Sequence, residues 1–372
     1  MPKQILITGG AGFIGSHVAA ELLSQGHKVR ALDSLVPQVH GGERRRPQYL
    51  PTGVELIVGD IRNPDVVSRA LDGIDSVVHL VALVGVGQSM YQIAEYTSVN
   101  NLGTAVLLET LSSHPVECLV VASSMSIYGE GLYRDSDGNI QSAQDRSLQQ
   151  LKMGEWEIRD SHGQPLTPVP TPENKPPVLA SIYALSKFDQ EKQCLILGRT
   201  YGIPTVALRF FNTYGPNQAL SNPYTGVLSN FASRVLNGQP PLIFEDGLQK
   251  RDFVSVYDVA RACRMALETP AAAGLAINIS SGEAMTVKEI AERTVAAIGR
   301  GDIQPAITGK YRAGDIRHCF ADISLARQVL GWKPQVTLEQ GLEDLAEWLE
   351  GQTAVDRGVE ARAELAARGL MV

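Results

Sequence analysis

Residues 4–15 read QILITGGAGFIG, a short apolar run that leads directly into a glycine-rich turn. The run predicts a β-strand at 4–9, and the apolar pattern of SHVAAELLSQGH (16–27) predicts a helix after the turn. In this context the glycines allow a tight turn, a close approach of a pyrophosphate to the backbone, and close packing of the helix on the strand. The phosphate would bind the free N–H groups at the start of the helix. The residues that we expect to hold a dinucleotide here are Gly9, Gly12, Phe13, Ile14 and Gly15.

The alternation of strand and helix patterns continues through the first half of the chain. Helical patterns follow at 64–73 and 101–114. The strand candidates are mostly hydrophobic throughout, as in strands of a parallel sheet that are buried on both faces. They lie at 28–33, 54–60, 75–82, 116–124, 204–210 and 276–281. This pattern predicts an α/β fold with a Rossmann-type doubly wound parallel sheet.

The C-terminal third mixes helical patterns with short extended pieces, which predicts a smaller mixed α/β lobe. We assign 1–210 and 248–282 to the sheet domain, and 211–247 and 283–372 to the lobe. A polar, proline-rich insertion at 131–180 interrupts the sheet domain. Loops of this length are usually functional lids or surface insertions, and both interpretations stay open. The Ala-, Arg- and Glu-rich tail predicts a terminal helix, for which packing on the surface is favoured over binding of a partner.

Composition excludes several classes of function. The chain has 33 Lys and Arg against 40 Asp and Glu, a formal net charge of −7, and lacks the basic runs of nucleic-acid-binding proteins. Its four cysteines are scattered without metal-site spacing, which indicates reduced thiols and no metal. We see neither a signal peptide nor an apolar stretch long enough to cross a membrane, and therefore expect a cytoplasmic protein.

The end of the second predicted strand indicates which dinucleotide is bound. Asp33 lies there, eighteen residues after Gly15. A carboxylate at this place can bind both ribose hydroxyls of NAD and would repel the 2′-phosphate of NADP. Arg30 and the arginines at 44–46 leave NADP open, but NAD is the prediction. At the end of the third strand, Asp60 and Ile61 could reach an adenine.

Two further motifs carry hydroxyl groups that could act in catalysis. In YALSK (183–187), Tyr183 and Lys187 are four residues apart and lie on one face of a helix. Lowering a tyrosine pKa from about 10 to near 7 takes roughly 4 kcal/mol, which a lysine ammonium and a nicotinamide cation could supply. Upstream, SSMSIYG (123–129) follows a buried strand, where we expect Ser123 to be an ordinary hydrogen-bonding residue.

Together these motifs resemble the extended short-chain dehydrogenase/reductase family. Further phrases resemble its nucleoside-diphosphate-sugar epimerase/dehydratase branch in order: VVHLVA (77–82), LRFFNTYGP (208–216), RDFVSVYDVA (251–260) and LGWKP (330–334). The resemblance implies that Tyr183 is the base, that Lys187 lowers its pKa and holds the nicotinamide ribose, and that Ser124 bonds the reacting oxygen. It also implies that Val81 contacts the cofactor. The implied substrate-binding residues are Ser126, Asn212, Arg251 and Arg312.

The residues after Ser124 favour one reaction of this branch. Dehydratases of the family carry an acid pair where Met125 and Ser126 stand, and decarboxylating members usually carry glutamate at the position of Ser126. Glu130 is out of register. A 4-epimerase needs no further acid, because hydride leaves C4 and returns to the opposite face of a 4-keto sugar. The phrase GDIRHCFADI (314–323) and the insertion resemble dTDP-L-rhamnose 4-epimerase-like proteins.

Alternatives follow from the same resemblance. The substrate is expected to be a dTDP- or UDP-linked sugar, with a dTDP-6-deoxyhexose such as dTDP-L-rhamnose first and UDP-glucose or UDP-galactose next. An NAD(P)H-dependent 4-keto-sugar reductase and a non-catalytic NAD-binding protein are the other two classes. Members of the family are typically homodimers that pair helices of the sheet domain, so a homodimer is expected.

Overall fold

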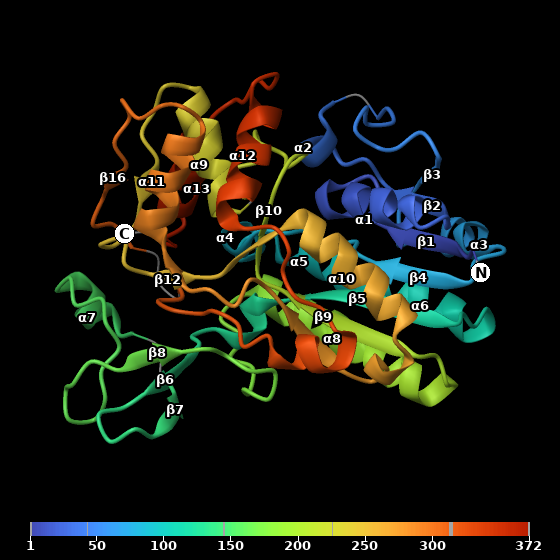
Figure 1. Ribbon diagram of the computed structural model, residues 1–372, viewed down its shortest axis with the longest axis horizontal. Helices are drawn as coiled ribbons and strands as arrows, with labels where there is room; N and C mark the ends of the chain where they lie inside the picture. Colours follow the sequence, from blue (N-terminus) through green and yellow to red (C-terminus); the bar gives the residue numbers. More distant parts are fainter. Residues whose placement is uncertain (1, 43, 144–145, 225, 312–314, 371–372) are drawn as a thin grey trace.

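The computed structural model of the protein describes residues 2–42, 44–143, 146–224, 226–311 and 315–370. A seven-stranded parallel sheet forms the centre of the molecule, in the order β14-β9-β5-β4-β1-β2-β3 (Figure 1). The predicted doubly wound α/β fold is thereby confirmed. The strands are β1 (Gln4–Thr8), β2 (Lys28–Asp33), β3 (Val54–Val58), β4 (Ser76–His79), β5 (Cys118–Ser124), β9 (Thr205–Phe210) and β14 (Ala276–Ile279).

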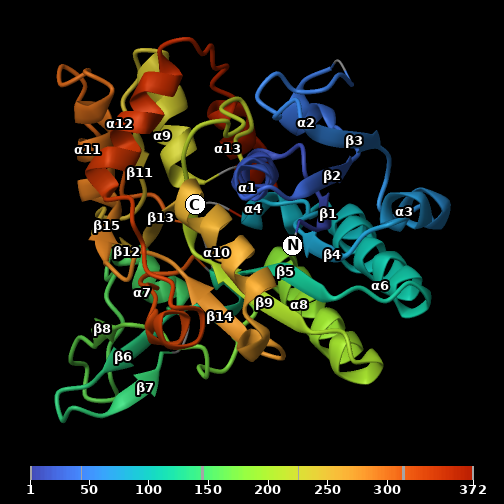
Figure 2. The same ribbon diagram turned by 45° about the vertical axis from the view of Figure 1, so that its right-hand side comes forward.

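Helices cover both faces of this sheet. Successive side chains of β1 point to opposite faces, so Ile5 and Ile7 join one apolar core while Leu6 joins another. The first core includes residues of α1 and α10, which pack against each other, and the second includes residues of α3, α6 and α8 (Figure 2). Strand β3 lies at the sheet edge, where Val58 is 49% exposed. These helices are α1 (Phe13–Ser24), α3 (Pro64–Leu71), α6 (Gly103–Ser113), α8 (Ile182–Tyr201) and α10 (Val256–Glu268).

A second group of helices has an apolar core of its own. Phe231 of α9, Ile290 of α11 and Leu342 of α12 are buried and belong to one apolar cluster. The division of the chain into two lobes at the predicted boundaries stays a prediction. The elements of this part are α9 (Val227–Leu236), α11 (Val287–Ala297), α12 (Leu338–Leu349), β10 (Asn212–Tyr214), β11 (Leu242–Ile243), β12 (Lys250–Arg251), β13 (Phe253–Ser255), β15 (Met285–Thr286) and β16 (Ala306–Ile307).

The described parts of the insertion and of the tail both contain regular secondary structure. Three short antiparallel strands, in the order β7-β6-β8, form the insertion, which projects from the lower left in Figure 1. The tail contains the predicted helix, α13 (Gly358–Ala367). The insertion holds β6 (Leu132–Arg134), β7 (Ile140–Ser142), β8 (Thr167–Val169) and α7 (Leu148–Lys152). The remaining short elements are α2 (Pro37–His40), α4 (Val86–Ser89), α5 (Ile93–Tyr96), the π-helical turns η1 (Thr97–Leu102) and η4 (Ala326–Leu330), and the 3₁₀ turns η2 (Met125–Tyr128) and η3 (Pro270–Ala272).

Among the helices that the structure describes, none combines the length and the apolar character needed to cross a membrane.

Candidate active site

A large cavity of about 860 Å³ lies at the carboxyl ends of the sheet strands, between the sheet and the helices of the second core group. Ligands of open α/β sheets bind at this edge. Arg312 lies outside the described residues. Every other residue that we predicted from the sequence lines this cavity: Gly9, Gly12, Phe13, Ile14, Gly15, Asp33, Asp60, Ile61, Val81, Ser124, Ser126, Tyr183, Lys187, Asn212 and Arg251.

The glycine-rich turn forms one end of the cavity. Gly9 has φ +70°, a left-handed conformation that side chains other than glycine rarely adopt. A Cβ atom at Gly15 would overlap the carbonyl oxygen of Gly9, so a larger residue would push helix α1 away from the strand. The turn thus leaves its backbone open toward the cavity at the start of α1, which suits a pyrophosphate.

Asp33 is held at the end of β2 by the same turn. Its carboxylate accepts hydrogen bonds from the backbone N–H of Ala11 at 3.0 Å and of Leu35 at 2.9 Å, and the side chain is buried. A fixed negative charge at this place favours ribose hydroxyls over a phosphate. Two residues after the end of β3, Asp60 lies at the cavity and pairs with Arg62, whose guanidinium lowers the pKa of the carboxyl.

The arginines that left NADP open are mostly engaged elsewhere. Arg30 donates to Glu55 at 2.8 Å and to the carbonyl of Asp72 at 2.7 Å. Arg46 donates to the carbonyl of Val54 at 2.9 Å. Arg44 does line the cavity. With the buried carboxylate of Asp33 in the wall, the residues present fit NAD.

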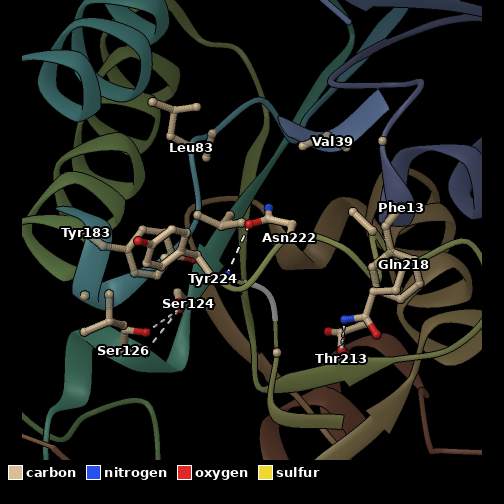
Figure 3. Close-up of a pocket in the computed structure, with 18 of the residues that line it drawn as sticks. Phe13, Val39, Leu83, Ser124, Ser126, Tyr183, Thr213, Gln218, Asn222 and Tyr224 are labelled. Atoms are coloured by element: carbon tan, nitrogen blue, oxygen red, sulfur yellow. Dashed lines mark hydrogen bonds between the residues drawn. The ribbon is translucent and has the colours of Figure 1, made fainter. Parts of the chain in front are cut away.

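The hydroxyls that we predicted to be catalytic come together from two elements (Figure 3). Ser124 ends β5 in an extended conformation and caps the turn η2: its Oγ accepts from the N–H of Ser126 at 3.1 Å and donates to Ser126 Oγ at 3.0 Å. Tyr183 enters from the first turn of α8. Burial raises the pKa of Tyr183, and a hydrogen bond with Ser124 opposes this effect. The phenol thus faces the hydroxyl pair that the sequence singled out.

Lys187 is buried one turn further along α8. Its Nζ donates to Gln190 Oε1 at 2.8 Å, and burial lowers the pKa of Lys187 to about 8. We expected Lys187 to lower the pKa of Tyr183, but burial dominates and the pKa of Tyr183 lies above its ordinary value. The phenol therefore needs an additional positive charge nearby to act as a base at neutral pH.

A buried ionic network lies behind the strand end. Ser123 donates to Glu191 Oε2 at 2.7 Å, as expected for an ordinary hydrogen-bonding residue. Arg209 binds both oxygens of Glu191, at 2.8 and 2.9 Å, and donates to the hydroxyl of Tyr128 at 2.8 Å. Because these groups satisfy one another, they hold β5 and α8 in register beneath Ser124.

Two predicted substrate residues line the cavity while bound to backbone. The side-chain amide of Asn212 donates to the carbonyl of Asp252 at 3.1 Å. The guanidinium of Arg251 donates to the carbonyls of Arg317 at 3.0 Å and of Ile316 at 2.5 Å. Both side chains are therefore fixed in the cavity wall, from which the charge of Arg251 acts on the interior.

Several residues of the wall were missed from the sequence. The loop before α9 contributes Gln218, Asn222 and Tyr224, which Figure 3 draws among the lining residues together with Phe13 and Tyr183. The tail also reaches the cavity through Asp356 and Ala361 among others. Loop and tail are brought here only by tertiary packing, and no motif in the sequence marked them.

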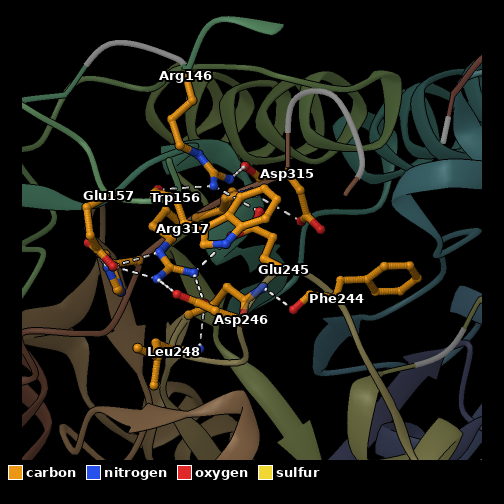
Figure 4. A network of polar contacts seen from close by, with 12 residues as sticks. Arg146, Trp156, Glu157, Phe244, Glu245, Asp246, Leu248, Asp315 and Arg317 are labelled. Carbon is orange, nitrogen blue, oxygen red and sulfur yellow. Dashed lines mark hydrogen bonds and ion pairs between the residues drawn. The ribbon is translucent and has the colours of Figure 1, made fainter. Parts of the chain in front are cut away.

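The insertion at 131–180 contributes little to the cavity wall: of its described residues only Ala180, at its end, lines the cavity. It is not inert either, because it meets a buried hub around Arg317, which is fully buried (Figure 4). Arg317 donates to Glu157 of the insertion at 2.5 Å and to Asp246 at 2.7 Å. Arg146 of the insertion donates to the carbonyl of Asp315 at 2.9 Å. The insertion thus braces the segment at 315–317, part of which lines the cavity.

Comparison with known proteins shows the family of this chain. A family model described as the NAD dependent epimerase/dehydratase family matches residues 5–151 and 159–280. The chain is 33% identical over 351 residues to a dTDP-L-rhamnose 4-epimerase of Burkholderia thailandensis, covering 93% of this chain and 95% of that protein. It is 32% identical over 350 residues to a putative UDP-glucose 4-epimerase of Methanocaldococcus jannaschii, covering 93% and 98%. The fold matches the UDP-glucose 4-epimerase of Thermus thermophilus in complex with NAD, with a TM-score of 0.72, 30% identity, and coverage of 94% and 100%.

Fold and site define an enzyme that works with a nicotinamide dinucleotide. The chain belongs to the NAD dependent epimerase/dehydratase family. NAD is its cofactor, as predicted from Asp33.

Proposed function

We propose that this enzyme is a nucleotide-sugar 4-epimerase whose substrate is a dTDP-6-deoxyhexose such as dTDP-L-rhamnose. The alternative substrates are UDP-glucose and UDP-galactose. Two relatives point in these directions, since one is a dTDP-L-rhamnose 4-epimerase and the other a putative UDP-glucose 4-epimerase, at similar identity.

One observation carries the choice of epimerisation: neither of the two residues that follow Ser124 in the chain is an acid. These residues are Met125 and Ser126. The N–H of Ser126 donates to Ser124 Oγ, and Ser126 Oγ accepts a hydrogen bond from that hydroxyl. The next acid in the chain, Glu130, is buried and accepts from the backbone N–H of Arg317 at 2.5 Å. It therefore has no role in the cavity. Without acids at these two positions, elimination of water would lack the acid pair that dehydratases carry there, whereas epimerisation needs no further acid beyond Tyr183.

The chain's own groups then divide the work. When bound, NAD supplies the acceptor and later the donor of the C4 hydride. Tyr183 Oη removes the proton of the C4 hydroxyl and returns it at the end, and Ser124 Oγ donates a hydrogen bond to the same oxygen. The Lys187 ammonium, present below its pKa of about 8, favours the phenolate. Arg251 in the wall adds positive charge for the diphosphate.

The character of the wall supports a 6-deoxy sugar. Leu83, Val84 and Met125 line the cavity together with the catalytic hydroxyls. Apolar side chains bury a methyl group favourably, whereas a 6-hydroxyl group would need a polar partner. The nucleotide would then lie toward the second lobe, where Phe244 and Gln249 line the cavity.

The test is to incubate the purified enzyme with dTDP-L-rhamnose, UDP-glucose and UDP-galactose separately, without added reductant. Proton NMR should show a C4 epimer from the dTDP sugar and slower or no change in the UDP sugars. Turnover of the UDP sugars alone would shift the assignment to the alternative. Strict dependence on added NADH or NADPH would instead indicate a 4-keto-sugar reductase.

We also infer that the enzyme is a homodimer that pairs around α8. Ile196 of α8 is 54% exposed, and Leu185 of the same helix and Leu102 of the adjoining turn η1 are exposed as well. Exposed apolar side chains on neighbouring elements are typical of an interface between subunits.

A further inference from the structure

Gln190 occupies a place that neither the glycine motif nor the YALSK motif marks. It follows Lys187 by three residues on α8, so the two side chains share a face of the helix. Gln190 is fully buried. A buried glutamine must satisfy one carbonyl oxygen and two N–H groups inside the protein, since each unpaired group costs about 1–3 kcal/mol.

All of these groups are satisfied. The Oε1 atom of Gln190 accepts the hydrogen bond from Lys187 Nζ at 2.8 Å. Its Nε2 atom donates to the carbonyl of Val81 at 3.1 Å and to Thr104 Oγ1 at 2.8 Å. The amide therefore joins α8 to the segment after β4 and to the start of α6.

The hydrogen bonds also fix which way the amide faces. Thr104 uses its only hydrogen to donate to the carbonyl of Asn100 at 2.5 Å, so its oxygen accepts from its other neighbours. His79 Nε2 lies 2.9 Å from that oxygen and must carry the hydrogen, while His79 Nδ1 accepts from Thr8 Oγ1 at 2.7 Å. Burial lowers the pKa of His79 to about 3, so the ring is neutral, consistent with this tautomer.

A flipped amide would be strongly unfavourable. Its NH₂ group would face the Lys187 ammonium, and its oxygen would face the carbonyl of Val81. Both contacts are repulsive in a site without bulk water. The chain Thr8–His79–Thr104 thus locks the Gln190 oxygen toward Lys187.

We propose that Gln190 is a positioning residue for the epimerase reaction, holding the Lys187 ammonium at the depth where it serves Tyr183 and the cofactor. The inference rests on the proposed role of Lys187. A neutral acceptor has a particular use here, because it orients the ammonium without neutralising its charge. The neighbouring carboxylate cannot take this part, since Glu191 is already bound by Arg209 and Ser123.

Few other groups act on the charge of Lys187. Burial has the largest effect and lowers its pKa, and Cys194 and Glu191, from the same helix, act in the opposite direction. Tyr183 lies one turn before it, and His79 faces it from β4 as a neutral ring. A change at residue 190 should therefore be read out directly in the titration of Lys187.

The test compares Gln190→Met and Gln190→Glu in the full-length, NAD-loaded enzyme. Methionine removes the acceptor at similar volume, so kcat should fall about 10- to 100-fold while KM changes less than about threefold. Glutamate is isosteric and adds a negative charge, which favours the ammonium, although its second oxygen then faces the carbonyl of Val81 and lowers stability. The alkaline limb of the kcat profile should move to higher pH in Gln190→Glu, by about one pH unit or more, and to lower pH in Gln190→Met.

A second readout does not depend on turnover. In protein labelled with ¹³C at the lysine ε-carbon, and assigned with Lys187→Met, the Lys187 signal should titrate in the same opposite directions in the two variants. The matched controls are the same two substitutions at Gln193, which lies three residues after Gln190 on α8 and donates its side-chain amide to Asp189. They should leave the Lys187 titration unchanged. Melting curves check that each variant is folded.

A purely structural role would lower stability without moving the titration in opposite directions. Unchanged Lys187 titration in both Gln190 variants, with kcat within about twofold of wild type, would overturn the inference while leaving the proposed function intact. If Lys187→Met itself remained fully active, the proposed role of Lys187 would fail instead. If only Gln190→Met unfolds, the titration of Lys187 in Gln190→Glu still decides between these outcomes.

Discussion

The Arg234 guanidinium donates to the carboxylate of Asp356 at 2.6 Å, and this pair fastens the C-terminal tail to helix α9 at the rim of the cavity. Both side chains line the cavity and are largely shielded from solvent. Ala361 and Leu365 of α13 continue the tail along the same wall. The tail therefore belongs to the binding site, whereas its sequence predicted only a packed surface helix.

Breaking this pair should weaken sugar binding more than catalysis. In Asp356→Asn the tail loses a charge-assisted hydrogen bond, which is worth about 1.5–3 kcal/mol when intact. We expect KM for the nucleotide sugar to rise about 5- to 10-fold, with kcat within about twofold, in steady-state assays. Glu364→Gln on α13 breaks only an exposed pair with Arg368 and serves as the control. Equal KM values in both variants would contradict a role for the tail in binding.

The assignment of the base predicts a strong effect of one hydroxyl group. Tyr183→Phe should lower kcat by about 10² to 10⁴, the usual contribution of general acid–base catalysis, with the nucleotide sugar still bound. Ser124→Ala should lower kcat less, since it removes one hydrogen bond to the reacting oxygen. Tyr201→Phe, at the exposed end of the same helix, should have no effect. Turnover of Tyr183→Phe at the wild-type rate would show that another group is the base.

Lys187 should make stability depend on pH. Its pKa is about 8 in the folded protein and 10.5 as the ordinary value, because burial disfavours the ammonium. Between these pH values the unfolded chain binds more protons at this residue, so the stability of the wild type rises with pH. Relative to Lys187→Met, the wild type should gain free energy of unfolding from pH 8 to 10.5 in urea titrations. Lys192→Met, an exposed lysine of α8, controls for the loss of a charge; a flat difference would refute the burial effect.

The brace formed by the insertion can be tested at Arg146. This side chain pairs with Glu245 at 2.9 Å and donates to the carbonyl of Asp315 at 2.9 Å. In Arg146→Ala the segment at 315–317 loses its support, so KM should rise about fivefold, equivalent to about 1 kcal/mol. The melting temperature should fall as well. Arg159→Ala removes a more exposed arginine of the insertion and should leave both values unchanged.

The proposed dimer predicts a sensitive position on α8. Ile196→Glu places a charge in the inferred interface and should produce a monomer in light scattering coupled to size-exclusion chromatography. Ile307→Glu, at a similarly exposed position on β16, should not change the mass. A wild-type protein that is already monomeric at micromolar concentration would rule out this interface.

The sheet could be predicted from the sequence because two separate features indicate each strand. Each is a hydrophobic run, and each is followed by a helical pattern or a turn, so all seven strands were found. The prediction of strands buried on both faces failed most clearly at the edge strand β3, where Val58 is 49% exposed. Strand ends were less certain: β4 ends at His79, although the apolar run continues to Ala82.

The cavity residues that belong to sequence motifs were predicted. The residues that only tertiary packing brings to the cavity were missed. Ser124, Tyr183 and Lys187 stand in spaced motifs, and the fold brings them to one cavity. Asp356 could not be placed, since its partner Arg234 lies 122 residues earlier in the chain. Gln190 did carry a signal, because a residue three positions after a buried lysine must face the same neighbours.

Trp156, beside the Arg317 hub in Figure 4, gives the protein an optical probe of its own. Its ring centroid lies 6.1 Å from that of Tyr311, just before the segment that borders the cavity, and Arg146 donates to its carbonyl. The other two of the three tryptophans are packed away from this region: Trp332 is fully buried and donates to the carbonyl of Asp258, and Trp348 packs in the core of the second helix group. Emission from Trp156 is therefore expected to respond to changes in the brace around Arg146 and Tyr311.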